Sequence, residues 1–134
     1  MILIDTNILV DVLQDDPQWA GWSAAQLAHW AATGPLAINP IVYAELAPLF
    51  DEPSALDRVL STLDIRMEDM PREALFLAGK AHYAYRRRGG TRQGVLSDFL
   101  IGAHARVLHV PLLTRDARRY VRDFPGLALL TPDK

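Results

Sequence analysis

The stretch ILIDTNILV, residues 2–10, decides the fold because it joins an apolar run to a polar turn and then to a second apolar run. Residues 2–4 are short, apolar and bounded by an acid, which predicts a buried strand. Apolar side chains then recur at helical spacing at Ile8, Leu9, Val12 and Leu13, and Thr6 or Asn7 is the expected N-cap. The stretch therefore predicts a strand that leads directly into a helix.

The same alternation continues along the chain. Further short apolar strands are expected at residues 36–38, around 65, at 110–113 and at 127–130, separated by helices. Asn39 followed by Pro40 predicts one helix start, and Ser97 is the expected N-cap of a helix that runs to about residue 107. Alternating strands and helices predict an α/β fold in which helices cover both faces of a parallel sheet.

Length and composition place the chain among ordinary globular proteins. It has 134 residues, 50% of them apolar, and contains no cysteine. We expect a single domain over residues 1–134 in a reducing, cytoplasmic compartment. The N-terminus does not resemble a signal peptide, and no apolar run approaches the roughly 18 residues of a membrane span, so no membrane partner is expected.

Charge is divided unevenly along the chain. The net charge is −2, but residues 1–57 contain eight acids and no Lys or Arg, whereas residues 58–134 contain all 14 bases and have a net charge of +6. Ten of those bases lie within residues 80–122, together with only two acids, Asp98 and Asp116. Arginine outnumbers lysine 12 to 2, and its planar guanidinium suits phosphate. This distribution favours a polyanionic partner, although clustered arginines are also typical of a solvated helix face.

Four acids stand where ligands bind in such sheets, at or just beyond the carboxyl ends of strands. They are Asp5, Glu45, Asp98 and Asp116. Asp98 could simply complement a helix dipole, but four converging carboxylates would repel one another unless divalent cations lay between them. Oxygen ligands without a His or Cys pattern favour Mg²⁺ or Mn²⁺.

Such a site beside an arginine-rich segment predicts phosphodiester hydrolysis by metal-activated water. The neighbouring Thr6, Asn7 and Thr114 either support the site or act only as helix caps. Candidate contacts to a nucleic-acid backbone are Arg86, Arg87, Arg88, Arg92, Arg115, Arg118 and Arg119. The four histidines show no ligand or triad spacing, and we assign them structural roles.

Trp19, Trp22 and Trp30 have offsets that place all three on one face of the second predicted helix. Burial in the core is one interpretation. The other is a partly exposed groove for an apolar partner helix or a dimer contact.

Four stretches, each with one acid, resemble in order the PIN-domain ribonucleases, and specifically the VapC-type toxins of toxin-antitoxin pairs. They are residues 4–10, 39–46, 97–105 and 113–116. The resemblance runs the length of the chain. It implies a PIN-like three-layer α/β/α sandwich with about five parallel strands, a metal site on Asp5, Glu45, Asp98 and Asp116, and Mg²⁺- or Mn²⁺-dependent cleavage of RNA such as tRNA or rRNA. It also implies a homodimer and a small cognate antitoxin.

Other function classes are weaker. A haloacid-dehalogenase phosphatase needs a second Asp where Asn7 stands, and a receiver domain needs a late lysine after a strand, whereas the only lysines are Lys80 and Lys134. P-loop and dinucleotide fingerprints are absent. An RNA-processing PIN nuclease without an antitoxin and a non-catalytic binding module remain as alternatives.

Overall fold

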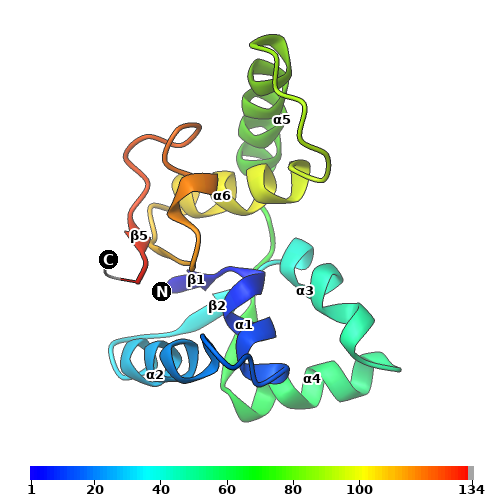
Figure 1. Cartoon of the computed structure of the whole chain (residues 1–134), viewed down its shortest axis with the longest axis vertical. Helices are drawn as coiled ribbons and strands as arrows, with labels where there is room; N and C mark the ends of the chain where they lie inside the picture. The colour runs from blue at the N-terminus through cyan, green and yellow to red at the C-terminus, as the bar shows by residue number, and fades with distance from the viewer. Residues whose placement is uncertain (133–134) are drawn as a thin grey trace.

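Five short parallel strands form one sheet in the computed structural model of the chain, which describes residues 1–132 (Figure 1). Their order across the sheet is β3-β2-β1-β4-β5, so the N-terminal strand is central. Leu3 pairs with Ala37 on one side and with Leu112 on the other. The strands are β1 (Ile2–Ile4), β2 (Leu36–Ile38), β3 (Ile65–Met67), β4 (Leu112–Leu113) and β5 (Leu129–Leu130).

In the part of the chain that the structure describes, six helices flank this sheet, which confirms the predicted α/β/α sandwich. They are α1 (Thr6–Leu13), α2 (Ala20–Ala31), α3 (Pro40–Leu46), α4 (Pro53–Thr62), α5 (Arg72–Arg87) and α6 (Leu96–Leu108). Helix α5 packs along α6, and α1 packs against α2. In Figure 1, α5 and the loop that follows it extend away from the sheet. Within residues 1–132, no helix is both long enough and apolar enough to cross a membrane.

Helix starts agree only in part with the sequence predictions. Asn39 caps α3 as expected, since its side chain accepts a hydrogen bond from the Val42 amide at 3.0 Å. The prediction of Thr6 or Asn7 as the first cap is wrong, because Asp5 occupies that position and accepts from the Thr6 amide at 2.8 Å. The prediction for Ser97 is also wrong, because α6 begins one residue earlier and places Ser97 in its first turn. Between β4 and β5 the chain forms only a 3₁₀ turn, over Ala117–Arg119.

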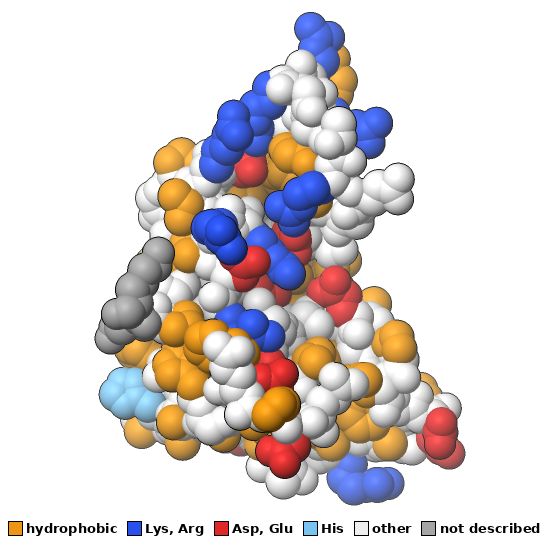
Figure 2. Space-filling model, viewed as in Figure 1, with side chains coloured by type: hydrophobic (Ala, Val, Ile, Leu, Met, Phe, Trp, Pro, Cys, Tyr) orange, Lys and Arg blue, Asp and Glu red, His pale blue; other side chains and the backbone are white. Residues whose placement is uncertain are grey.

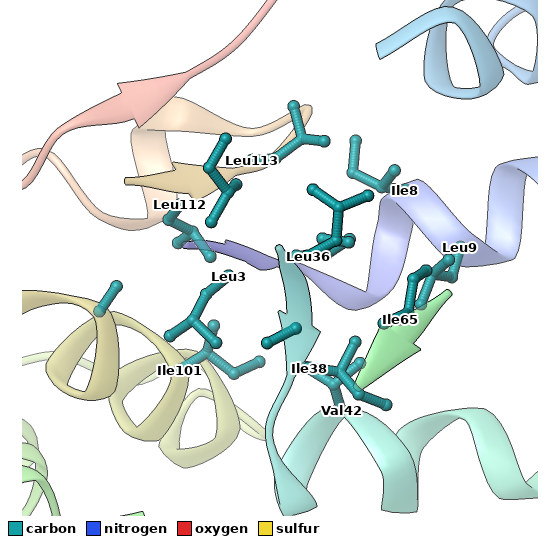
Figure 3. Packing of buried hydrophobic residues seen from close by; sticks show 14 of the residues in the cluster. Leu3, Ile8, Leu9, Leu36, Ile38, Val42, Ile65, Ile101, Leu112 and Leu113 are labelled. Atoms are coloured by element: carbon teal, nitrogen blue, oxygen red, sulfur yellow. The ribbon is translucent and has the colours of Figure 1, made fainter. Parts of the chain in front are cut away.

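The core lies where the central strands meet α1, α3 and α6. Leu3, Leu36 and Ile38 are almost fully buried, and Figure 3 shows them close to Ile101 of α6 and to Val42 of α3. A strand that is buried on both faces contains apolar residues throughout. This explains why the sequences of β1, β2 and β4 are unbroken apolar runs.

The chain order of the strands fixes where a ligand would bind. From the central β1 the chain proceeds outward to β2 and β3, and then crosses to β4 and β5 on the other side. The strand order therefore reverses between β1 and β4, and ligands of open parallel sheets bind at the carboxyl ends of the strands at this switch point. Asp5 directly follows β1, and Thr114 directly follows β4.

Candidate metal centre

Asp5 is the fixed point of the site. It is 1% exposed, and its Oδ2 accepts hydrogen bonds from Thr114 Oγ1 at 2.7 Å and from the Tyr120 hydroxyl at 2.7 Å. Its Oδ1 accepts from the Thr6 amide at the start of α1. A buried carboxylate is stable only when it is well hydrogen-bonded. These bonds hold the Asp5 side chain in one orientation at the switch point.

Thr6, Asn7 and Thr114 make direct contacts with the acids or with one another. Thr6 Oγ1 donates to Glu45 Oε1 at 2.5 Å, which ties the exposed Glu45 of α3 to the start of α1. Asn7 Nδ2 donates to Thr114 Oγ1 at 3.3 Å and lies 3.5 Å from Asp5 Oδ2. The threonines and Asn7 therefore connect segments of the site, whereas the capping bond belongs to Asp5.

Asp98 and Asp116 are joined by a guanidinium. Arg119 Nε donates to Asp116 Oδ2 at 3.0 Å, and its Nη1 lies 3.4 Å from Asp98 Oδ1. Arg92, in the loop before α6, adds an ion pair to Asp98 at 3.7 Å. Figure 2 shows the same mixture, with arginine or lysine side chains lying over acidic ones in the middle of this face. Arg119 thus bridges two of the four acids.

Electrostatic coupling shows that the acids share one region. Burial raises the pKa of Asp98 to about 6, the Arg119 guanidinium opposes this rise, and the nearby Asp5 and Glu45 carboxylates add to it. Burial alone would lower the pKa of Arg119, but Asp98, Asp5 and Asp116 raise it above its ordinary value. Asp5 and Glu45 therefore act electrostatically on Asp98, and Asp5, Asp98 and Asp116 act on Arg119, whereas a shared metal site stays a prediction.

The donor set suits a hard divalent cation. Four carboxylates supply oxygen ligands only, and burial together with the Asp5 and Glu45 carboxylates raises the pKa of Asp98, so a nearby cation would favour its ionised form. Among the described residues, no three acids or histidines stand close enough together to form a ready metal cluster. Asp5, Glu45, Asp98 and Asp116 are the residues that would hold such a cation.

Sequence reasoning missed two residues that build the site. Tyr120 is fully buried, and burial and the adjacent Asp5 raise the pKa of its hydroxyl, so it remains a proton donor. Asp11 on α1 is 1% exposed and binds Arg115 through two hydrogen bonds, at 2.6 and 2.9 Å, and Ser23 at 2.7 Å. Two sequence signals could have found them. Tyr120 is an aromatic residue among charged ones, and Asp11 is an acid within an otherwise apolar part of a helix.

Gly102 provides a test of how tightly the Tyr120 side of the site is packed. A Cβ at Gly102 would lie 2.7 Å from the Phe124 ring and 3.0 Å from the Tyr120 ring. We expect Gly102→Ala to lower the free energy of unfolding by about 1–2 kcal/mol, because the overpacking exceeds the gain in helix propensity. Urea denaturation measures this.

Gly79 on α5 is the matched control, since a Cβ there meets nothing within 4 Å. Gly79→Ala should stabilise the protein by up to about 1 kcal/mol. Equal effects of the two substitutions would contradict the packing at Gly102.

The arginines predicted to bind a nucleic-acid backbone differ in their environments. Arg88 pairs with Asp123 and lies over the Tyr85 ring, and Arg115 is held by Asp11. Arg92 and Arg119 face the acids, as described above. Arg86, Arg87 and Arg118 are exposed. Contact with nucleic acid stays a prediction for all of them.

The three tryptophans are all half-buried but have different surroundings. Trp22 and Trp30 lie on α2 and pack against the hydrophobic core. Trp19 precedes the helix, contacts Trp22 edge to face at 5.9 Å, and lies beneath the Arg115 guanidinium at 5.2 Å. A partner groove on these residues stays a prediction.

Comparison with known proteins identifies the family. The PIN-domain family model matches residues 2–125, and the chain therefore belongs to the PIN-domain family. No curated protein matches the chain.

Solved structures of VapBC and related toxin-antitoxin complexes have the same fold. VapBC2 from Rickettsia felis, solved with a DNA fragment from its promoter, aligns with a TM-score of 0.74 and 26% identity over 99% of this chain and 100% of that one. VapBC-1 from nontypeable Haemophilus influenzae gives 0.72 and 20%, covering 98% of both chains. A toxin-antitoxin complex from Klebsiella pneumoniae gives 0.66 and 24%, covering 100% of this chain and 99% of that one.

Proposed function

We propose that this protein is a divalent-metal-dependent endoribonuclease and the toxin of a toxin-antitoxin pair. The proposal is carried by the ion pairs of Arg119 with Asp98 and Asp116, near enough to Asp5 for its charge to act on both Asp98 and Arg119, together with the bond from Thr6 to Glu45, all in a PIN fold. The similarity to VapBC complexes along the whole chain supports the toxin assignment.

Different residues of the chain have different roles in the proposed reaction. Tyr120 and Thr114 donate to Oδ2 of Asp5, and the Thr6 amide donates to its Oδ1, so the carboxylate is held in one orientation. Arg119 is charged at every relevant pH and lies beside Asp98 and Asp116, where it can contact a phosphate that enters. Mg²⁺ or Mn²⁺ held by Asp5, Asp98 and Asp116, with Glu45, would neutralise charge on the phosphate and lower the pKa of the attacking water.

A cognate antitoxin and a homodimer are part of the same proposal, as is a cytoplasmic location. The antitoxin would have to cover or reshape the acidic site to prevent cleavage. Because the structural relatives are toxin-antitoxin complexes, we expect the gene for a small partner protein beside the gene for this chain.

Incubation of the purified protein with total bacterial RNA tests the proposal. We expect a discrete set of new 5′-phosphate ends in Mg²⁺ or Mn²⁺ and none in EDTA. Asp98→Asn is the matched inactive variant, because asparagine keeps the shape of the side chain and removes the charge.

Cleavage that persists in EDTA, or that is equal in Asp98→Asn, would contradict a nuclease centre at these acids. RNA binding without cleavage under all conditions would favour the non-catalytic binding module. Cleavage without a neighbouring antitoxin gene would favour an RNA-processing nuclease.

A further inference from the structure

A hollow of about 450 Å³ lies directly beside the acidic site, which is within the size range of small-ligand sites. Its wall is formed by the chain leaving β4 and the chain leaving β5. Asp116 lines this hollow and also pairs with Arg119, so the hollow adjoins the candidate metal centre at Asp116. The other lining side chains that matter here are Trp19, Arg115, Arg118, Thr131 and Pro132.

The aromatic side of the hollow is preorganised. Trp19 is held by the bond from its amide to Asp16 Oδ2 at 2.8 Å and by its edge contact with Trp22. Arg115 lies over the Trp19 ring and is fixed by its two bonds to the buried Asp11, which use Nε and Nη2. The Nη1 group is not used by that pair. A flat aromatic and guanidinium surface therefore exists before any ligand enters.

We infer that this hollow binds one unstacked nucleotide of a single-stranded RNA, next to the phosphodiester presented to the acids; this inference rests on the proposed function. Single-stranded nucleic acids bind through aromatic side chains on which bases stack and through arginines that contact phosphate or stack in turn. The Trp19 ring, with the Arg115 guanidinium over it, supplies the flat surface, and the exposed Arg118 adds a positive charge to the lining.

The composition of the hollow favours a nucleotide over an apolar peptide helix. Two arginines, one carboxylate and a threonine contribute to its lining, so its polar character does not suit an apolar helix face. Trp19 lines the hollow, whereas Trp22 and Trp30 pack against the core. The flat Trp19 and Arg115 side chains suit a base, whereas the exposed Arg118 suits a phosphate, so we place the base in the hollow and its phosphate beside Arg118.

Tryptophan fluorescence tests the inference directly. The chain has three tryptophans, so Trp22→Phe with Trp30→Phe leaves Trp19 as the only reporter. In the Asp98→Asn background with Mg²⁺, we expect single-stranded homopolymers of about ten ribonucleotides to quench this fluorescence. Duplex RNA of the same length should quench it far less.

Binding affinities separate stacking from charge. Trp19→Ala should weaken binding about 5- to 50-fold without changing the salt dependence, and Trp19→Phe should restore most of the loss. Arg118→Ala should reduce the slope of log affinity against log salt by about 0.7. Thermal denaturation of each variant shows that it is folded.

Several results would overturn the inference. Unchanged affinity of Trp19→Ala, or an equal loss with Trp19→Phe, would remove the stacking site. Quenching by a co-expressed antitoxin but not by RNA would assign the hollow to a protein. If the wild type cleaves RNA and Trp19→Ala is equally active, the nucleotide site is refuted and the nuclease function stands. If RNA quenches the fluorescence but is never cleaved, the nucleotide site stands and the nuclease function is refuted.

Discussion

Asp98→Asn is expected to abolish RNA cleavage and at the same time to stabilise the metal-free protein. Activity should fall by at least about 1,000-fold, because the substitution removes a charge needed to hold the cation. Stability should rise because burial and the Asp5 and Glu45 carboxylates disfavour the ionised form of Asp98 in the folded state. A gain in stability that accompanies a loss of function is typical of a site built for a ligand.

The pH dependence of this gain follows from the sign of the pKa shift. Folding raises the pKa of Asp98 from 3.8 to about 6, so the folded state binds the proton more tightly than the unfolded state. Above pH 6 the ionised carboxylate therefore lowers stability, and below pH 3.8 it makes no contribution. For this partly solvated group we expect about 1 kcal/mol at pH 7.5, falling to zero near pH 4.

Thermal denaturation in EDTA at several pH values measures the effect, and the exposed Asp51 provides the matched control Asp51→Asn. Added Mg²⁺ should reverse the order, since only the wild type gains stability from binding the cation. A lower Tm for Asp98→Asn in EDTA at pH 7.5 would show that its ion pairs with Arg119 and Arg92 outweigh the burial cost.

The parts of the site that the sequence could predict are those fixed by strand ends. Asp5 stands where an apolar strand becomes a helix, and the parallel sheet brings that position beside the residues that follow β4. Local pattern and sheet geometry together were enough to place Asp5 beside Thr114, which donates to it. The helix cap at Asp5 was misassigned because Thr, Asn and Asp all form such caps and stand side by side.

The pairings inside the site could not be predicted, because they join residues far apart in the chain. Asp98 and Arg119 are separated by 21 residues, and Asp11 and Arg115 by 104. An arginine-rich segment has the same composition whether its guanidinium groups face solvent, phosphate or internal acids. Tyr120 gave no periodic signal because it follows a single 3₁₀ turn. Packing of the segment 114–124 against α6 and Asp5 decides these contacts.

The largest effect on stability is expected for Asp11→Ala. Asp11 is almost fully buried, and its two oxygens bind the Arg115 guanidinium and the Ser23 hydroxyl. Removing one partner of such a pair leaves the other charge without compensation, which costs about 3 kcal/mol for buried pairs. Arg115 is 28% exposed and regains some hydration, so we expect about 2–3 kcal/mol in urea denaturation.

A double-mutant cycle isolates the pair from the lost packing. Arg115→Ala alone leaves a buried carboxylate without its partner, whereas the double variant has neither charge. The sum of the stability losses in the two single variants should therefore exceed the loss in the double variant by about 2 kcal/mol. Asp51→Ala should change stability by less than about 0.5 kcal/mol. Additive losses would mean that Asp11 stabilises α1 and α2 through Ser23 alone. In that case Arg115 would be free to leave Trp19, and the aromatic wall beside the acids would not be fixed in advance of a ligand.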